Sequence, residues 1–140
     1  MRLLLAVDDS KFSEAATQAV IAQYQPEGTE VKVLNVVDLA IPIPTSDAAG
    51  FRQESLKHGQ ELVQRTERLL SNAGYKTQTA VDEGDPKSKI IDQATQWNAE
   101  LIVVGSHGRK GVDRFLMGSV AEGVVRHAHC SVEIVRVPKS

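Results

Sequence analysis

Short apolar runs alternate with segments of helical periodicity along the whole chain, and this alternation restricts the fold more than any other feature. Five runs have the length of strands: 3–7, 31–37, 75–81, 101–104 and 132–137. Four segments between them carry apolar residues at helical spacing: 12–20, 52–73, 86–97 and 119–129. Because parallel strands need crossover helices, the sequence predicts an α/β fold, an open five-stranded parallel sheet with helices on both faces in a three-layer sandwich. We expect residues 1–140 to form a single domain.

Residues that favour helix ends mark the limits of these helices. Ser119, with a glutamate three residues later, has the spacing of a capping box, so we expect Ser119 to be the N-cap of the last helix. Gly74 is expected at the C′ position after the second helix, and Asp85 as the N-cap before Pro86. Residues 38–50 contain Ile-Pro-Ile-Pro and small polar residues, which predicts a loop.

Composition excludes several classes of protein. Sixteen Lys and Arg against eighteen Asp and Glu give a net charge of −2, without the basic excess typical of a nucleic-acid binder. A lone cysteine, Cys130, rules out an internal disulfide and a cysteine-rich zinc site and suits a reducing compartment. No apolar run approaches the roughly 20 residues of a membrane span, and no signal peptide follows Met1. We therefore expect a soluble, cytoplasmic protein.

The segment GSHGRKGVDRFLMGS, from Gly105 to Ser119, follows the fourth apolar run directly. Gly105 and Gly108 can take positive φ and let a ligand approach the backbone, while Gly118 and Ser119 open a helix whose unpaired amides attract anions. The segment matches neither the Walker A nor the Rossmann glycine pattern. It predicts a phosphate-binding loop of another class.

Sheet topology indicates where such a ligand would bind. In open parallel sheets, ligands bind beyond the carboxyl ends of the strands where the strand order reverses. If the first and fourth strands flank that reversal, Asp8 and Gly105 face one crevice.

The glycine segment resembles, in every fixed position, the Gly-x2-Gly-x9-Gly-Ser signature that universal stress proteins use to bind ATP. The resemblance extends over essentially the whole chain, through LLLAVDDS, VKVLNVVD, EGDP, VVGSHGRKG and SVEIVRV. It implies the adenine nucleotide alpha hydrolase-like fold. The sequence departs from the family at Asn35, where the family often has histidine.

The resemblance also implies which residues bind the nucleotide. By analogy with the family, an aspartate after the first strand contacts the nucleoside, a residue of the second strand lies against adenine, and the glycine segment wraps the phosphates. Matched by motif, these residues are Asp8, Val36, Gly105, Gly108, Gly118, Ser119 and Val120. Ala6 and Val7 are expected to line the base pocket, and Arg109, with Lys110 and Arg114 nearby, to screen a triphosphate.

Each assignment has a structural alternative. Asp8 could cap the first helix and Ser119 the last, since both residue types favour such positions. Val36 by itself would be read as a core residue, and Gly105 as the end of a strand. None of the histidines, His107, His127 and His129 among them, has a metal partner at recognisable spacing.

The function that follows is an ATP-binding regulatory or stress-response protein whose nucleotide state a protein partner recognises. Its cofactor would be ATP with Mg or Mn, without flavin or NAD, and hydrolysis would be slow at most because no general base is positioned. Two alternatives stay open: a receiver domain phosphorylated on Asp82, and a true nucleotide hydrolase. The final strand, 132–137, lies at a sheet edge, and the resemblance implies a homodimer paired through it.

Overall fold

The computed structural model describes residues 1–38, 48–108 and 117–137. Strands and helices alternate through the described residues as predicted. In chain order they are β1 (Arg2–Ala6), α1 (Lys11–Gln23), β2 (Glu30–Val37), α2 (Ala48–Asn72), β3 (Lys76–Glu83), α3 (Pro86–Trp97), β4 (Leu101–Gly105), α4 (Ser119–His127) and β5 (Ser131–Val135).

All the strands join one parallel sheet in the order β3-β2-β1-β4-β5. β1 lies at its centre, with Leu3 opposite Val31 of β2 and Leu101 of β4. The chain adds β2 and β3 on one side of β1, then returns to add β4 and β5 on the other. The order therefore reverses between β1 and β4, as expected from the sequence.

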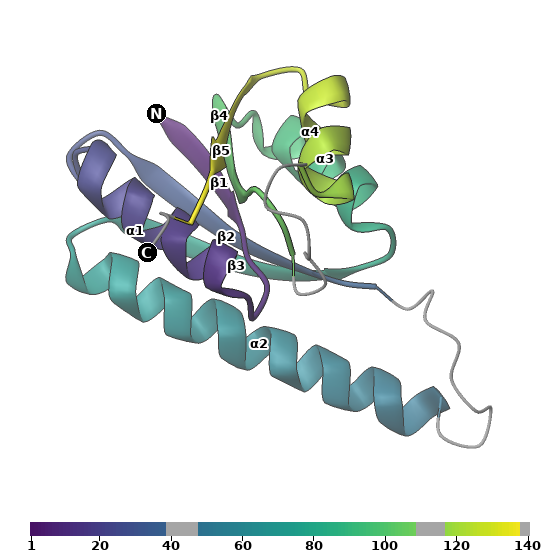
Figure 1. Ribbon diagram of the computed structural model, residues 1–140. Coiled ribbons are helices and arrows are strands. Elements are labelled where there is room, and N and C mark those ends of the chain that lie inside the picture. The colour runs from purple at the N-terminus through teal and green to yellow at the C-terminus, as the bar shows by residue number, and fades with distance from the viewer. Residues whose placement is uncertain (39–47, 109–116, 138–140) are drawn as a thin grey trace.

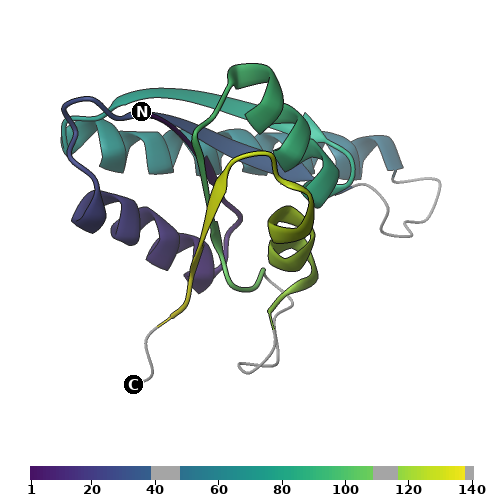
Figure 2. The ribbon, with the colours of Figure 1, turned by 90° about the horizontal axis from the view of Figure 1, so that it is seen from above.

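Helices cover both faces of the sheet, and the predicted three-layer sandwich is confirmed (Figure 1 and Figure 2). Successive residues of a strand point to opposite faces. Leu3 and Leu5 pack in one core with residues of α1 and α2, whereas Leu4 and Ile102 pack in a second core with residues of α3 and α4. Burial on both faces explains why β1 and β4 appear in the sequence as unbroken apolar runs.

Two predicted helix ends are confirmed in detail. Gly74, with φ of +99°, stands at C′ of α2, where its N–H donates to the Ser71 carbonyl and that of Tyr75 to the Leu70 carbonyl. These two bonds form a Schellman motif. Asp85 is the N-cap of α3 and accepts a hydrogen bond from the Ser88 amide at 3.2 Å.

Two other predicted boundaries are wrong. α2 begins at Ala48, so residues 48–50 belong to a helix rather than to the predicted loop 38–50; residues 39–47 lie outside the described part of the chain. The first turns of α2 extend past the sheet and are exposed, so no buried apolar face marks them in the sequence (Figure 1). β5 ends at Val135, two residues before the predicted end.

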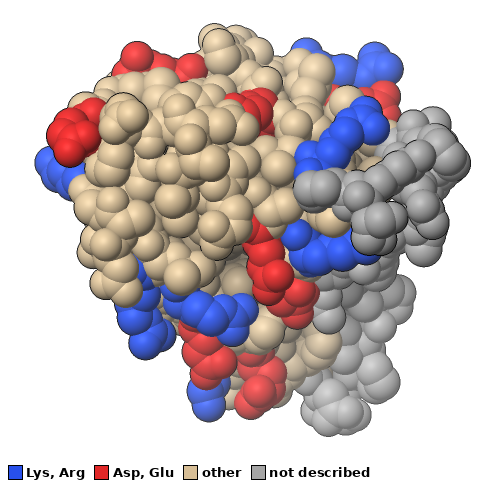
Figure 3. Space-filling model, turned by 60° about the vertical axis from the view of Figure 1, so that its left-hand side comes forward, with Lys and Arg blue, Asp and Glu red and all other residues tan. Residues whose placement is uncertain are grey.

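Charged side chains of both signs are mixed on one face of the molecule (Figure 3). On the face in Figure 3, acidic and basic groups lie close to one another. This mixture matches the small net charge of the chain. In the part of the chain that the structure describes, no helix combines the length and the apolarity needed to cross a bilayer.

α2 packs closely against the sheet at Gly59. A Cβ atom at this position would lie 2.6 Å from Oδ1 of Asn35 and 3.3 Å from Cγ1 of Val81. Asn35 cannot yield easily, because its Nδ2 donates a buried hydrogen bond to the carbonyl of Val7 at 2.9 Å. Glycine at position 59 therefore sets the distance between α2 and the sheet.

Gly59→Ala should destabilise the protein by about 1–3 kcal/mol, because overpacking against Asn35 exceeds the gain in helix propensity. Gly50→Ala is the matched control in the same helix, since a Cβ there meets nothing within 4 Å. It should leave stability unchanged or raise it by up to about 1 kcal/mol. Urea unfolding of both variants measures the difference, and equal midpoints would contradict the packing argument.

Candidate functional site

The aspartate after β1 and the glycine segment after β4 meet at the carboxyl edge of the sheet, where the strand order reverses. A Cβ atom on Gly108 would lie 3.0 Å from Oδ2 of Asp8, so the carboxylate lies against the Gly108 backbone. The Gly118 N–H donates to the carbonyl of Ser106 at 2.7 Å, which brings the start of α4 to the same place. Asp8 and the glycine segment therefore lie together at the edge where the sequence predicts that a ligand would bind.

Asp8 is held by the first turn of α1. Its Oδ1 accepts hydrogen bonds from the Ser10 amide and from Oγ of Ser13, each at 2.9 Å, and its own amide donates to Ser13 Oγ. The N-cap of α1 is Ser10, so the alternative in which Asp8 caps this helix is wrong. Because the cap network uses Oδ1, the carboxylate is fixed with Oδ2 toward Gly108.

The end of β1 is tied to β2 immediately before Asp8. The Val7 amide donates to the Leu34 carbonyl at 2.8 Å, and the buried side chain of Asn35 donates to the Val7 carbonyl. Sequence reasoning noted Asn35 only as a departure from the family pattern. Its structural role depends on a partner 28 residues away, which no local pattern in the sequence reveals.

Partly buried apolar residues from three elements lie on one face of the sheet near this edge. Ala6 of β1, Val36 of β2 and Val120 of α4 pack against the same core cluster, together with buried Val104. The side chain of Val7 packs in the opposite core, so the prediction that Val7 lines the base pocket stays a prediction about its main chain. Adjacent residues of a strand face opposite sides, and only Val7 main-chain atoms are available at this edge.

Gly105 and Gly108 do not have the positive φ that the sequence suggested; the described glycines that do are Gly28, Gly74 and Gly84. Close packing explains why position 105 is a glycine. A Cβ atom there would lie 2.7 Å from Cβ of Phe12 and 2.9 Å from the Phe12 carbonyl carbon. Glycine at this position allows the first turn of α1 to pack against the end of β4.

α4 begins without a side-chain cap. Gly118, not Ser119, is its N-cap, and Ser119 is the first helical residue, so the predicted capping box is wrong. The Gly118 carbonyl accepts the first helical hydrogen bond, from the Glu122 amide at 2.9 Å. The first-turn amides of α4 and the exposed Ser119 hydroxyl are therefore not used by a capping interaction. Such a helix start attracts anions.

The predicted role of the cationic residues in the glycine segment stays a prediction. Arg109, Lys110 and Arg114 lie outside the described residues. Within the described ranges, no cluster of three or more His, Cys, Asp or Glu side chains could hold a metal ion.

The model of the universal stress protein family matches residues 1–136. The chain belongs to this family. A universal stress protein of Methanocaldococcus jannaschii is 33% identical over 141 residues, covering 99% of this chain and 83% of the relative. The solved structure of UspA from Lactobacillus plantarum has a TM-score of 0.86 and 25% identity, covering 97% of each chain. This universal stress protein thus has the family's adenine nucleotide alpha hydrolase-like fold.

Two solved relatives hold nucleotides. The Arabidopsis thaliana protein has AMP bound, with a TM-score of 0.76, 19% identity and coverage of 99% and 92% of the two chains. The Archaeoglobus fulgidus universal stress protein is in complex with dAMP, with a TM-score of 0.72, 22% identity and coverage of 96% and 97%. At these identities, the likeness to this chain concerns the fold.

The strand order argues against the receiver-domain alternative. Receiver domains of the flavodoxin-like type have the order 2-1-3-4-5, which places the third strand beside the first. Here β3 is the edge strand, and Asp82 pairs with Val36 of β2 rather than with β1. Burial raises the pKa of Asp82, but hydrogen bonds from Gln93 and the Glu83 amide and the charge of Lys89 outweigh it and lower the pKa. Asp82 is therefore a partnered carboxylate separated from Asp8 by the width of β2.

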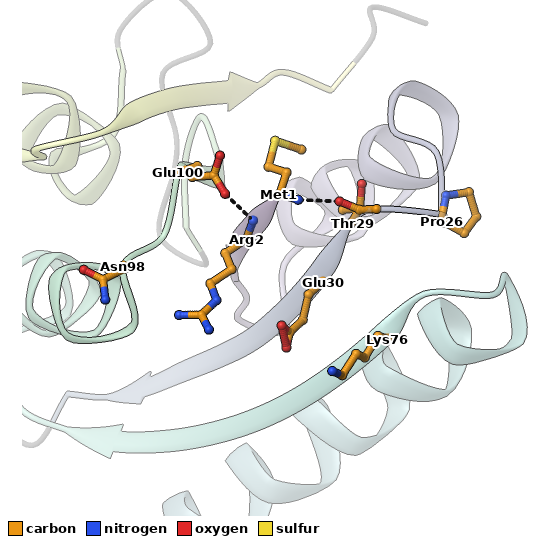
Figure 4. Close-up of a pocket in the computed structure, with 9 residues that line it drawn as sticks. Met1, Arg2, Pro26, Thr29, Glu30, Lys76, Asn98 and Glu100 are labelled. Carbon is orange, nitrogen blue, oxygen red and sulfur yellow. Dashed lines mark hydrogen bonds between the residues drawn. The ribbon is translucent and has the colours of Figure 1, made fainter.

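A hollow of about 550 Å³ lies at the opposite, amino end of the sheet (Figure 4). Arg2 and Lys76 line it together with Glu30 and Glu100. The Arg2 amide donates to Glu100, and the Arg2 guanidinium donates to the Trp97 carbonyl at 2.7 Å. The hollow is remote from Asp8 and the glycine segment, and Arg2 is already engaged by the protein.

Gly105→Ala should destabilise the protein by about 1–3 kcal/mol without any ligand present, because the new methyl group overlaps the Phe12 backbone. Gly50→Ala again serves as the control. Thermal unfolding in nucleotide-free buffer measures the effect. Wild-type stability in Gly105→Ala would mean that glycine is needed at this position only for a ligand.

Proposed function

We propose that this universal stress protein binds an adenine nucleotide at the carboxyl edge of β1 and β4, and that ATP is the occupant in the cell. The contact between Asp8 and Gly108 at the reversal of strand order is the observation that supports the proposal most directly. The AMP and dAMP complexes of relatives with the same fold add support. The resemblance of residues 105–119 to the family's ATP-binding signature supports a triphosphate as the bound nucleotide.

Each part of the nucleotide has suitable groups in this arrangement. The adenine ring would pack on the apolar side chains of Ala6, Val36 and Val120, and the ribose would bond to Asp8. The phosphates would lie on Gly105, Gly108 and Gly118 and accept hydrogen bonds from the α4 amides and Ser119. Arg109 would add charge, and a magnesium or manganese ion would be carried by the phosphates.

The proposed activity is a conformational switch with at most slow hydrolysis. Asp8 is the acid nearest to the proposed ligand, and its Oδ1 is engaged by two hydrogen bonds, which suits binding better than proton transfer. A bound nucleotide shifts the conformational population only by its differential affinity for two states. A protein partner in the stress response would recognise the favoured state.

The same proposal includes one domain over residues 1–140, a cytoplasmic location and a homodimer. Both cores share one sheet and reach from β1 to β5, which supports a single domain. Among the described strands, β5 pairs only with β4, and its Val132 and Ile134 carry apolar side chains. An edge of this kind is open to pairing with a second copy.

Val120→Lys should weaken ATP binding at least about tenfold, because an ammonium group would be introduced where the base packs. Val125→Lys, in the same helix but with Val125 47% exposed, should bind as the wild type does. Calorimetric titration with ATP and magnesium measures both. Mass spectrometry of small molecules released from denatured wild-type protein identifies the natural occupant. A folded wild type that binds no adenine nucleotide at millimolar concentration would refute the proposal.

Ile134→Pro should convert the dimer into a monomer without unfolding the sheet. The Ser106 amide donates to the Val135 carbonyl, so Val135 faces β4 and its neighbour Ile134 directs its N–H to the open edge. Proline removes this outward donor and is tolerated in edge strands. Sedimentation at tens of micromolar should give twice the 15.2 kDa mass for the wild type and the single mass for the variant. A monomeric wild type would contradict dimerisation.

A further inference from the structure

His107 lies inside the glycine segment, and its ring is held by three neighbours. The ring centroid is 5.1 Å from that of Phe12, with the planes tilted by 48°. Nδ1 is 3.1 Å from Oγ of Ser106. On the side of Gly118, the ring carbon Cδ2 is 3.7 Å from where a Cβ atom would stand. The imidazole is therefore wedged between the first turn of α1 and the start of α4.

The other ring nitrogen, Nε2, is buried and has no hydrogen-bond partner among the described residues. Buried polar atoms without partners are rare and cost free energy, so each one calls for an explanation. Nε2 is bonded to Cδ2, the atom that faces Gly118, so it lies beside the start of α4. That helix start lacks a side-chain cap as well.

We infer that His107 is a phosphate-binding residue of the nucleotide site, whose Nε2–H donates a hydrogen bond to an anionic phosphate oxygen. The inference rests on the proposed function, because the anion is part of the adenine nucleotide. Nε2 and the first-turn amides of α4 would then donate hydrogen bonds to the same phosphate group from adjacent positions. Gly108, the next residue, contacts Asp8 on the nucleoside side, so one short segment spans both parts of the ligand.

The contact with Ser106 determines which nitrogen carries the proton. When the Ser106 hydroxyl donates to Nδ1, the neutral ring has its proton on Nε2 and can donate from there. An acceptor at Nε2 selects this tautomer. Nucleotide binding should therefore change the ring from a mixture of tautomers to the Nε2–H form, with Ser106 Oγ–H directed at Nδ1.

A purely structural role makes a different prediction. If the ring only fills the space between Phe12 and Gly118, phenylalanine should replace it without effect on ligand binding. His107→Phe preserves the aromatic packing and removes both nitrogens. His107→Gln keeps an N–H donor in a smaller side chain. His127→Phe, at an exposed position in the last turn of α4, controls for the loss of a histidine.

The test is a calorimetric comparison of ATP with adenosine, which lacks the phosphates. His107→Phe should weaken ATP binding by about tenfold to 100-fold, as expected for the loss of a charge-assisted hydrogen bond, and leave adenosine binding unchanged. His107→Gln should recover part of the ATP affinity. His127→Phe should bind both ligands as the wild type does. An unchanged ratio of the two affinities in folded His107→Phe would overturn the inference.

A measurement on the wild type covers the case in which the variants do not fold. Long-range ¹H–¹⁵N spectra report the protonation of each imidazole nitrogen. On saturation with ATP, but not with adenosine, Nε2 of His107 should take the shift of a protonated nitrogen and Nδ1 that of an unprotonated one. Unmoved His107 resonances in a protein that binds ATP would overturn this inference and leave the proposed function intact. A wild-type protein that binds neither ATP nor adenosine would refute both this inference and the proposed function.

Discussion

The hydrogen bond from the Asn35 side chain to the Val7 carbonyl joins the elements on which the site depends. Asn35 lies in β2, its amide nitrogen donates to the carbonyl of Val7 immediately before Asp8, and its Oδ1 packs on Gly59 of α2. A buried amide must be paired, so this contact determines where β1 ends relative to both neighbours. Oδ1 of Asp8 then accepts hydrogen bonds from Ser10 and Ser13 in the first turn of α1, and Oδ2 is directed at Gly108.

Ser106 makes the corresponding connection on the other side of the reversal. Its N–H donates to the Val135 carbonyl at the end of β5, and its carbonyl accepts from Gly118 at the start of α4. One peptide segment thus joins the glycine segment, the anion-attracting helix start and the edge strand proposed for dimerisation. Displacement of α4 by a ligand would act on Ser106 and hence on β5, which offers a physical route by which a nucleotide could alter a dimer.

The elements that the sequence predicts well are those determined locally or by burial on both faces. β1 and β4 are unbroken apolar runs, Gly74 and Asp85 end and begin helices through contacts within five residues, and the reversal rule placed Asp8 beside the glycine segment. Ser119 was assigned one position away from the true N-cap because the bond from Gly118 to Ser106 is tertiary. Strand alternation also indicates that the side chains of Ala6 and Val7 point to opposite faces of the sheet, as they do in the two cores.

The glycines of the family signature are present for different physical reasons, and this affects what the signature can indicate. Gly105 is required by the approach of Phe12, a contact inside the fold, so it would be retained even in a chain that bound nothing. Gly108 and Gly118 lie against Asp8 and the Ser106–His107 backbone, where a methyl group would fill space at the proposed ligand. A buried, unpaired His107 nitrogen has no comparable packing explanation. Under the proposed function, the residues expected to distinguish a nucleotide-binding member from a merely folded one are therefore Asp8, His107, Gly108 and Gly118.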